Sequence, residues 1–155
     1  EMAEFAESMD WIHLHLALNH VPVMGTAFVG LLLLTGMIRK SEEIRRLSLW
    51  WLLALTVVAI PIKFTGDFAA EKLSEQIELE KGLISAHEEA ADQATTGIFF
   101  AGIAAAVALF KARNGNPVPQ LGLVAALIFT LLTLGLMART ANLGGQVRHP
   151  EIRGR

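Results

Sequence analysis

The sequence predicts an all-α protein, a four-helix transmembrane bundle with short amphipathic helices on its outer, non-cytoplasmic face. Hydrophobic residues make up 53% of the 155 residues and charged residues 18%, which is more apolar surface than a water-soluble chain of this size can bury. Four apolar stretches, at about residues 21–38, 47–65, 95–110 and 121–138, approach or reach the roughly 17–25 residues that cross a bilayer as a helix. Helices are expected because lone strands would leave their backbone groups unpaired in lipid. One domain over residues 1–155 follows.

Charges in the short loops predict the orientation of the bundle. Residues 39–46 carry four Lys and Arg side chains, and residues 111–120 carry two more. Short loops rich in Lys and Arg stay on the cytoplasmic side of a membrane. We therefore expect a protein of the bacterial inner membrane with both termini on the periplasmic side. The arginines of the C-terminal tail are inconsistent with this orientation, because they favour the cytoplasmic side.

The residues before the first span predict a helix boundary. Asn19 is a suitable N-cap residue, and Pro22 is tolerated in the first turn of a helix. On this interpretation residues 5–18 form a separate helix on the membrane surface. The alternative is one long helix with a kink at Pro22.

The segment between the second and third spans predicts a further break. Residues 67–81 have a helical pattern, and Gly82 suits the position after a helix C-terminus. Ser85 and Glu88 have the spacing of a capping box. We therefore expect the third long helix to start near His87, well above the bilayer.

Composition excludes several classes of site and partner. The chain has no cysteine, so disulfides, thiolate metal sites and covalent c-type haem are excluded. The net charge of −2 gives no sign of a nucleic-acid partner. No phosphate-binding glycine loop or nucleophile motif occurs, which favours an electron-transfer or accessory protein over an enzyme.

All five histidines are predicted to gather at the outer face. They precede or open the first span, open the third helix, or follow the fourth span, as His13, His15, His20, His87 and His149. Histidine is an ordinary surface residue at a membrane interface, but five at one face favour a functional role, as ligands or as proton carriers.

A haem b is the first candidate ligand. It needs two neutral imidazoles from different helices of a bundle, and His20 and His87 are predicted to supply them. Lys63 and Arg139, near the outer ends of the second and fourth spans, are predicted to bind the propionates. The alternative for these cations is extension to the lipid headgroups, or an ion pair between Lys63 and Asp67 one turn away.

A divalent metal is the second candidate ligand. Imidazole and carboxylate donors together suit zinc or copper. The predicted ligands are His20, His87 and His149 with Glu88 or Asp92, and His13 and His15 are possible substitutes or a second site. No spaced metal-binding motif supports this set.

Glycines occur both within the spans and as a pair in the C-terminal segment. Glycine and alanine recur at near-helical spacing in the first, third and fourth spans, which predicts close helix packing or room for a flat cofactor. Gly144 and Gly145 lie in the C-terminal segment, and paired glycines allow close backbone approach. That segment either folds back over the outer face or forms an unstructured end.

Three short segments carry a family resemblance. They are residues 18–23 (LNHVPV), 65–71 (TGDFAAE) and 87–91 (HEEAA). In these segments and in its layout the chain resembles a group of small bacterial four-helix integral membrane proteins that carry a domain of unknown function and are cytochrome-b-like in layout. The resemblance implies a four-span bundle with histidines near the outer face of the first and third spans, and it implies no activity.

The function that these patterns favour is a small b-type cytochrome-like protein that passes electrons near the outer membrane face. Its expected partners are the lipid bilayer and other membrane subunits or a periplasmic electron carrier. The alternatives are an accessory subunit of a larger membrane complex that binds nothing redox-active, and a divalent metal-binding membrane protein.

Overall fold

Four long helices make up the protein. A computed structural model describes residues 11–76, 81–149 and 151. The helices are α2 (His20–Ile38), α3 (Glu42–Gln76), α4 (Lys81–Lys111) and α5 (Gln120–Arg148), and the described residues contain no strand. All four helices are long and apolar enough to cross a membrane, so the predicted all-α transmembrane bundle is confirmed at this level.

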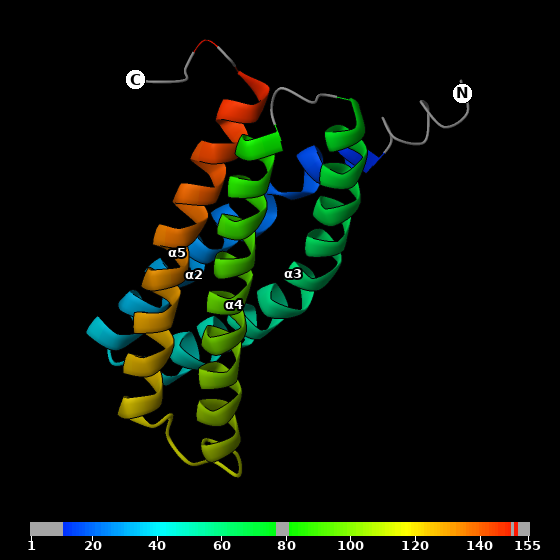
Figure 1. Ribbon diagram of the computed structural model, residues 1–155. Coiled ribbons are helices and arrows are strands. Elements are labelled where there is room, and N and C mark those ends of the chain that lie inside the picture. The colour runs from blue at the N-terminus through cyan, green and yellow to red at the C-terminus, as the bar shows by residue number, and fades with distance from the viewer. Residues whose placement is uncertain (1–10, 77–80, 150, 152–155) are drawn as a thin grey trace.

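The helices form a closed ring in space. α4 packs along most of α5, α3 packs against α4 and α2, and α2 closes the ring on α5. In Figure 1 the two short loops lie toward one end of the bundle, and the start of the described chain (blue) and the end of α5 (red) lie toward the other. We call the first the loop end and the second the histidine end, because His15 and His87 lie there.

The first boundary differs from the prediction. Residues 11–18 are helical and continue into α2 through one turn residue, Asn19. Asn19 has helical torsion angles, and its side chain makes no capping hydrogen bond, so it does not cap α2. The described part of the predicted surface helix is therefore almost continuous with the first span. Residues 5–10 of that prediction lie outside the described residues.

The other boundaries also extend beyond the apolar spans. α3 runs to Gln76 and α4 begins at Lys81. Gly82 therefore lies inside the first turn of α4 and Ser85 one turn further along, so neither predicted cap forms. α5 includes Gly144 and Gly145. A bend in α3 (Figure 1) accompanies Pro61, which lies within the helix and donates no backbone hydrogen bond.

The exposure of side chains is that of a bundle surrounded by lipid. The interior holds fully buried aliphatic side chains, among them Val29, Leu33, Leu52, Ile98 and Leu123. The outside carries large exposed apolar side chains, among them Met24, Leu31, Trp50, Phe64, Ile103 and Phe110. Exposed apolar residues in this number suit lipid rather than water.

Small residues set how closely the helices approach. A Cβ added at Gly102 of α4 would lie 2.5 Å from Oγ1 of Thr56 and 3.0 Å from its Cβ. The Thr56 hydroxyl is 2.9 Å from the Leu52 carbonyl and 3.2 Å from the Ile98 carbonyl. Close approach at a glycine lets a hydroxyl reach the neighbouring helix. In lipid no hydrophobic force drives helices together, so they associate through such packing and hydrogen bonds.

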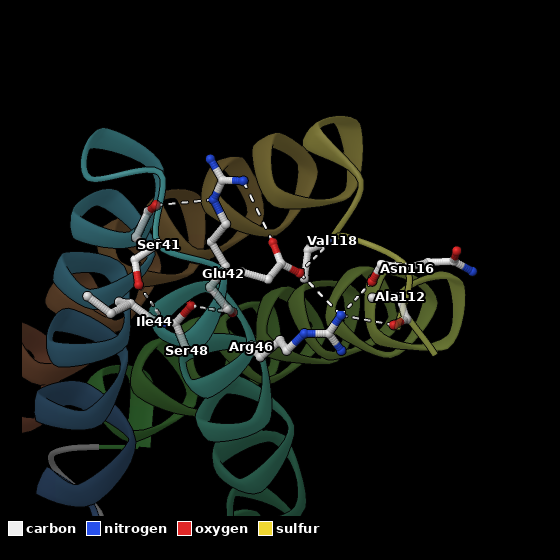
Figure 2. A network of polar contacts seen from close by, with 10 residues as sticks. Ser41, Glu42, Ile44, Arg46, Ser48, Ala112, Asn116 and Val118 are labelled. Atoms are coloured by element: carbon white, nitrogen blue, oxygen red, sulfur yellow. Dashed lines mark hydrogen bonds and ion pairs between the residues drawn. The ribbon is translucent and has the colours of Figure 1, made fainter. Parts of the chain in front are cut away.

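A polar clamp holds the loop end together, and Figure 2 shows it. Arg46 of α3 donates hydrogen bonds to the carbonyls of Ala112 (3.0 Å) and Asn116. Glu42 lies 3.2 Å from Arg46 and accepts a hydrogen bond of 2.6 Å from the Val118 amide. The loop between α4 and α5 is thus fixed to the start of α3.

We predict that Gly102→Ala destabilises the bundle. The added methyl group meets the β-branched Thr56, which has little freedom to move, and overpacking of this kind costs about 1–3 kcal/mol. Thermal unfolding in detergent measures the loss. The control is Gly135→Ala, because a Cβ at Gly135 meets nothing within 4 Å. An equal unfolding temperature for both variants would contradict the packing account.

We predict that Arg46→Met loosens the loop end. The methionine keeps the apolar stem but leaves two backbone carbonyls without their donor, a loss of about 1–3 kcal/mol. Arg39→Met, at an exposed side chain, is the control. Hydrogen exchange of the loop amides should rise in the Arg46 variant alone, and a similar rise in both would show that the clamp contributes nothing.

Candidate functional site

Two of the five histidines converge at the histidine end. His15 lies in the helical turns that precede α2, and His87 lies in the second turn of α4. Both rings are partly buried. The ring of His15 lies against α3, and the ring of His87 lies against α5. Two partly buried imidazoles from separate helices therefore lie at one end of the bundle.

The ring of His87 has a defined orientation. Its Nδ1 lies 3.0 Å from the backbone carbonyl of Thr140 on α5. A carbonyl oxygen only accepts, so Nδ1 carries the proton in the neutral ring. The lone pair of a neutral imidazole then lies on Nε2, which is the arrangement of a histidine ready to bind a metal.

The ring of His15 is oriented in the same way by α3. Its Nδ1 lies 3.4 Å from the hydroxyl of Thr65, and that hydroxyl donates its own hydrogen to the Ile62 carbonyl at 2.8 Å. The Thr65 oxygen therefore faces His15 as an acceptor. This acceptor favours the proton on Nδ1 and leaves the lone pair on Nε2.

Each imidazole packs against a glycine. A Cβ at Gly66 would lie 2.9 Å from Cε1 of His15, and a Cβ at Gly144 would lie 3.0 Å from Cε1 of His87. Real Cβ atoms do not approach so closely without displacing a neighbour. The two glycines therefore make the space in which the two rings lie.

The predicted cations join helices in the same region. Lys63 forms ion pairs with Asp67 on its own helix and, at 2.8 Å, with Asp92 on α4. The ion pair between Lys63 and Asp67, the alternative predicted for this lysine, is therefore confirmed. Arg139 of α5 is exposed and donates a hydrogen bond of 3.0 Å to the Gln93 side chain on α4.

The remaining histidines lie apart from this pair. His13 and His20 are exposed, and His149 is exposed and lies 2.9 Å from Glu151. Within residues 11–76, 81–149 and 151, no three His, Asp or Glu side chains form a group that could hold a metal ion. The structure thus brings His15, rather than His20, beside His87.

Sequence reasoning marked Gly144 as a glycine that allows close backbone approach, but it did not single out Thr65, Gly66 or Thr140 as residues that hold the rings. These residues act through contacts between helices, which no local motif marks. A signal that pairs His15 with His87 was nevertheless present. His15 precedes two glycines by ten and fifteen residues, and His87 precedes two glycines by the same intervals. Only His15, among the N-terminal histidines, shares this spacing with His87.

Comparison with family models, curated proteins and solved structures finds no match to this chain. The resemblance to small bacterial four-helix membrane proteins stays a prediction. The histidine pair is therefore interpreted from its geometry.

We predict that Lys63→Met weakens the contact between α3 and α4. The substitution leaves two carboxylates facing each other without a cation, at a cost of about 1 kcal/mol for a partly exposed group. Thermal unfolding at low and at high salt measures it. Salt screens exposed charges, so the difference from the native chain should shrink as salt rises. Lys40→Met, in the exposed loop, should show neither effect.

Proposed function

We propose that this protein is a small b-type cytochrome-like membrane protein, in which His15 and His87 bind haem near the periplasmic face and electrons pass through that haem. The observation that carries the proposal is a pair of partly buried imidazoles at one end of the bundle whose Nδ1 atoms already have acceptors. Each ring keeps its Nε2 lone pair for a metal. When bound, haem supplies one-electron oxidation and reduction.

The number of donors fits haem. Haem brings nitrogen donors of its own, so the chain would need to supply only two imidazoles, those of His15 and His87. Structural zinc takes four ligands, usually all from protein, and the pair offers two. The acceptors behind each ring are the outer hydrogen bonds that orient metal-ligating histidines and raise their basicity. Haem sites of this kind form in bundle cores from histidines on facing helices.

The two predicted propionate cations differ in availability. Lys63 already faces Asp67 and Asp92, so it would have to exchange a carboxylate for a propionate. Arg139 is exposed and gives one guanidinium nitrogen to Gln93, and its other N–H groups are suited to a carboxylate. Arg139 is the better candidate, with Lys63 holding α3 and α4 in register.

Charge supports the proposed location in a bacterial inner membrane. Four basic side chains lie in the first short loop and the start of α3, and two more lie at the end of α4. Short basic loops favour the cytoplasmic side, which leaves the histidine pair on the periplasmic side. A periplasmic electron carrier or neighbouring membrane subunits are the proposed partners. The alternatives are an accessory subunit without a cofactor, and a zinc or copper site.

We predict a reducible Soret band for the protein purified with haem supplied during expression. His15→Ala and His87→Ala should each lose most of it, because one axial ligand is missing. His20→Ala is the matched control and should retain the spectrum. Circular dichroism checks that every variant stays helical.

The other outcomes identify the alternatives. A colourless, fully helical protein that does not bind added hemin would exclude haem and would favour the alternative of an accessory subunit. Zinc or copper that purifies with the chain and is lost in the His87 variant would indicate the metal site. A spectrum that depends on His20 in place of His15 would overturn the ligand assignment.

A further inference from the structure

A few residues of the first long helix recur in the third. Four positions carry the same residue at a constant separation of 72: His15 and His87, Gly25 and Gly97, Phe28 and Phe100, and Gly30 and Gly102. A basic residue ends both segments, as Arg39 and Lys111. The shared glycines lie where helices meet, the shared histidines form the candidate site, and the shared phenylalanines are exposed.

The exposure of side chains repeats with the sequence. Positions 15–38 and 87–110 have the same class of exposure in order, and the class differs only at Leu18, Pro22 and Ala27 and their counterparts. Even the two phenylalanines are alike, with 53% of Phe28 and 51% of Phe100 exposed. Two helices of unlike sequence thus bury the same face, which indicates equivalent places in the bundle.

The second and fourth helices also correspond, at a separation of 78 positions. α3 begins at Glu42 and α5 at Gln120. Gly66 packs against His15, and Gly144, its counterpart, packs against His87. On α3, the Thr65 hydroxyl donates to the Ile62 carbonyl and lies 3.4 Å from Nδ1 of His15. On α5, the carbonyl of Thr140, the counterpart of Ile62, lies 3.0 Å from Nδ1 of His87. The loop of the second hairpin (residues 112–119) is five residues longer than that of the first (residues 39–41).

The contacts within the two hairpins correspond. A Cβ at Gly25 of α2 would lie 2.5 Å from Cδ2 of Leu55 on α3, and a Cβ at Gly97 of α4 would lie 2.7 Å from Oγ1 of Thr133 on α5. Gly97 is the counterpart of Gly25 at 72 positions, and Thr133 is the counterpart of Leu55 at 78 positions. Equivalent contacts at equivalent positions are what a two-fold axis produces.

We propose that His15 and His87 are equivalent ligands of one site on an approximate two-fold axis, and that each is positioned by a glycine and by the carbonyl four residues before it. The physical reason lies in the helix. Residue i and the carbonyl of residue i−4 lie on one face, and a glycine at i removes the Cβ that would cover that carbonyl. An imidazole from the neighbouring helix then reaches the carbonyl with Nδ1, directly in His87 and through the Thr65 hydroxyl in His15, and keeps Nε2 free.

Equivalence of the two histidines bears on the ligand that the site takes. Two like Nε2 donors would suit haem, for which the chain would need to supply two imidazoles. This part of the inference rests on the proposed function. His20 corresponds to Asp92, so the repeat gives His20 no partner histidine. One asymmetry remains, because Thr65 adds a hydroxyl acceptor where Leu143 is its counterpart.

Nitrogen NMR of the histidine-labelled protein in detergent tests the positioning without haem. At mildly alkaline pH, His15 and His87 should both carry the proton on Nδ1. The exposed His13 and His20 should favour Nε2, as free imidazole does. Different tautomers for His15 and His87, or two rings that behave like His20, would overturn the inference.

Matched glycine variants test the equivalence. Gly66→Ala should shift the tautomer of His15 alone, and Gly144→Ala that of His87 alone, while Gly135→Ala should shift neither. Each of the first two should weaken hemin binding about tenfold, the loss typical of a missing outer hydrogen bond. A difference between them of more than about tenfold in that affinity would contradict equivalence.

Failure of each idea has its own signature. If hemin does not bind but both rings hold their protons on Nδ1, the haem proposal fails and the two-fold arrangement of the rings stands. If hemin binds through His15 and His87 but the two glycine variants shift neither tautomer, the haem proposal stands and the positioning by glycine fails. The NMR measurement on the native chain does not depend on whether any variant folds.

Discussion

Close approach between helices is the constraint on which the rest of this structure depends. In lipid, aliphatic side chains gain little by leaving one apolar neighbour for another, so helices associate through close packing and hydrogen bonds. At Gly102, α4 approaches α3 so closely that the Thr56 hydroxyl lies 3.2 Å from the Ile98 carbonyl. At the loop end, where water reaches the chain, Arg46 joins α3 to the end of α4 through a hydrogen bond to a backbone carbonyl and an ion pair with Glu42.

The same constraint produces the candidate site. A glycine that lets two helices approach also uncovers a backbone carbonyl, and at Gly66 and Gly144 a histidine ring from the next helix fills the space. The carbonyl takes the ring proton, so packing fixes the tautomer, and the tautomer leaves a metal-binding lone pair. The histidine pair and the helix packing therefore have one physical origin.

Helix ends show where local patterns mislead. Asn19, Gly82 and Ser85 are residues that often cap helices, yet each lies in continuous or nearly continuous helix. Capping motifs report only the local preference of the chain to end a helix, and they take no account of contacts with other helices. Here α3 and α4 continue past the apolar spans, where the ion pairs of Lys63 with Asp67 and Asp92 join them. Interactions between helices outweigh a preference worth about 1 kcal/mol.

The sequence by itself determined the helical class, the four spans and the polarity of the loops, because each depends on properties summed along the chain. It also placed His15, His20 and His87 near one end. Only the tertiary structure decided that the rings of His15 and His87 pack against Gly66 and Gly144, because this depends on how far each helix is rotated and on which glycine faces which ring. Neighbouring histidines on one helix point in different directions, and contacts with α3 and α5 select among them.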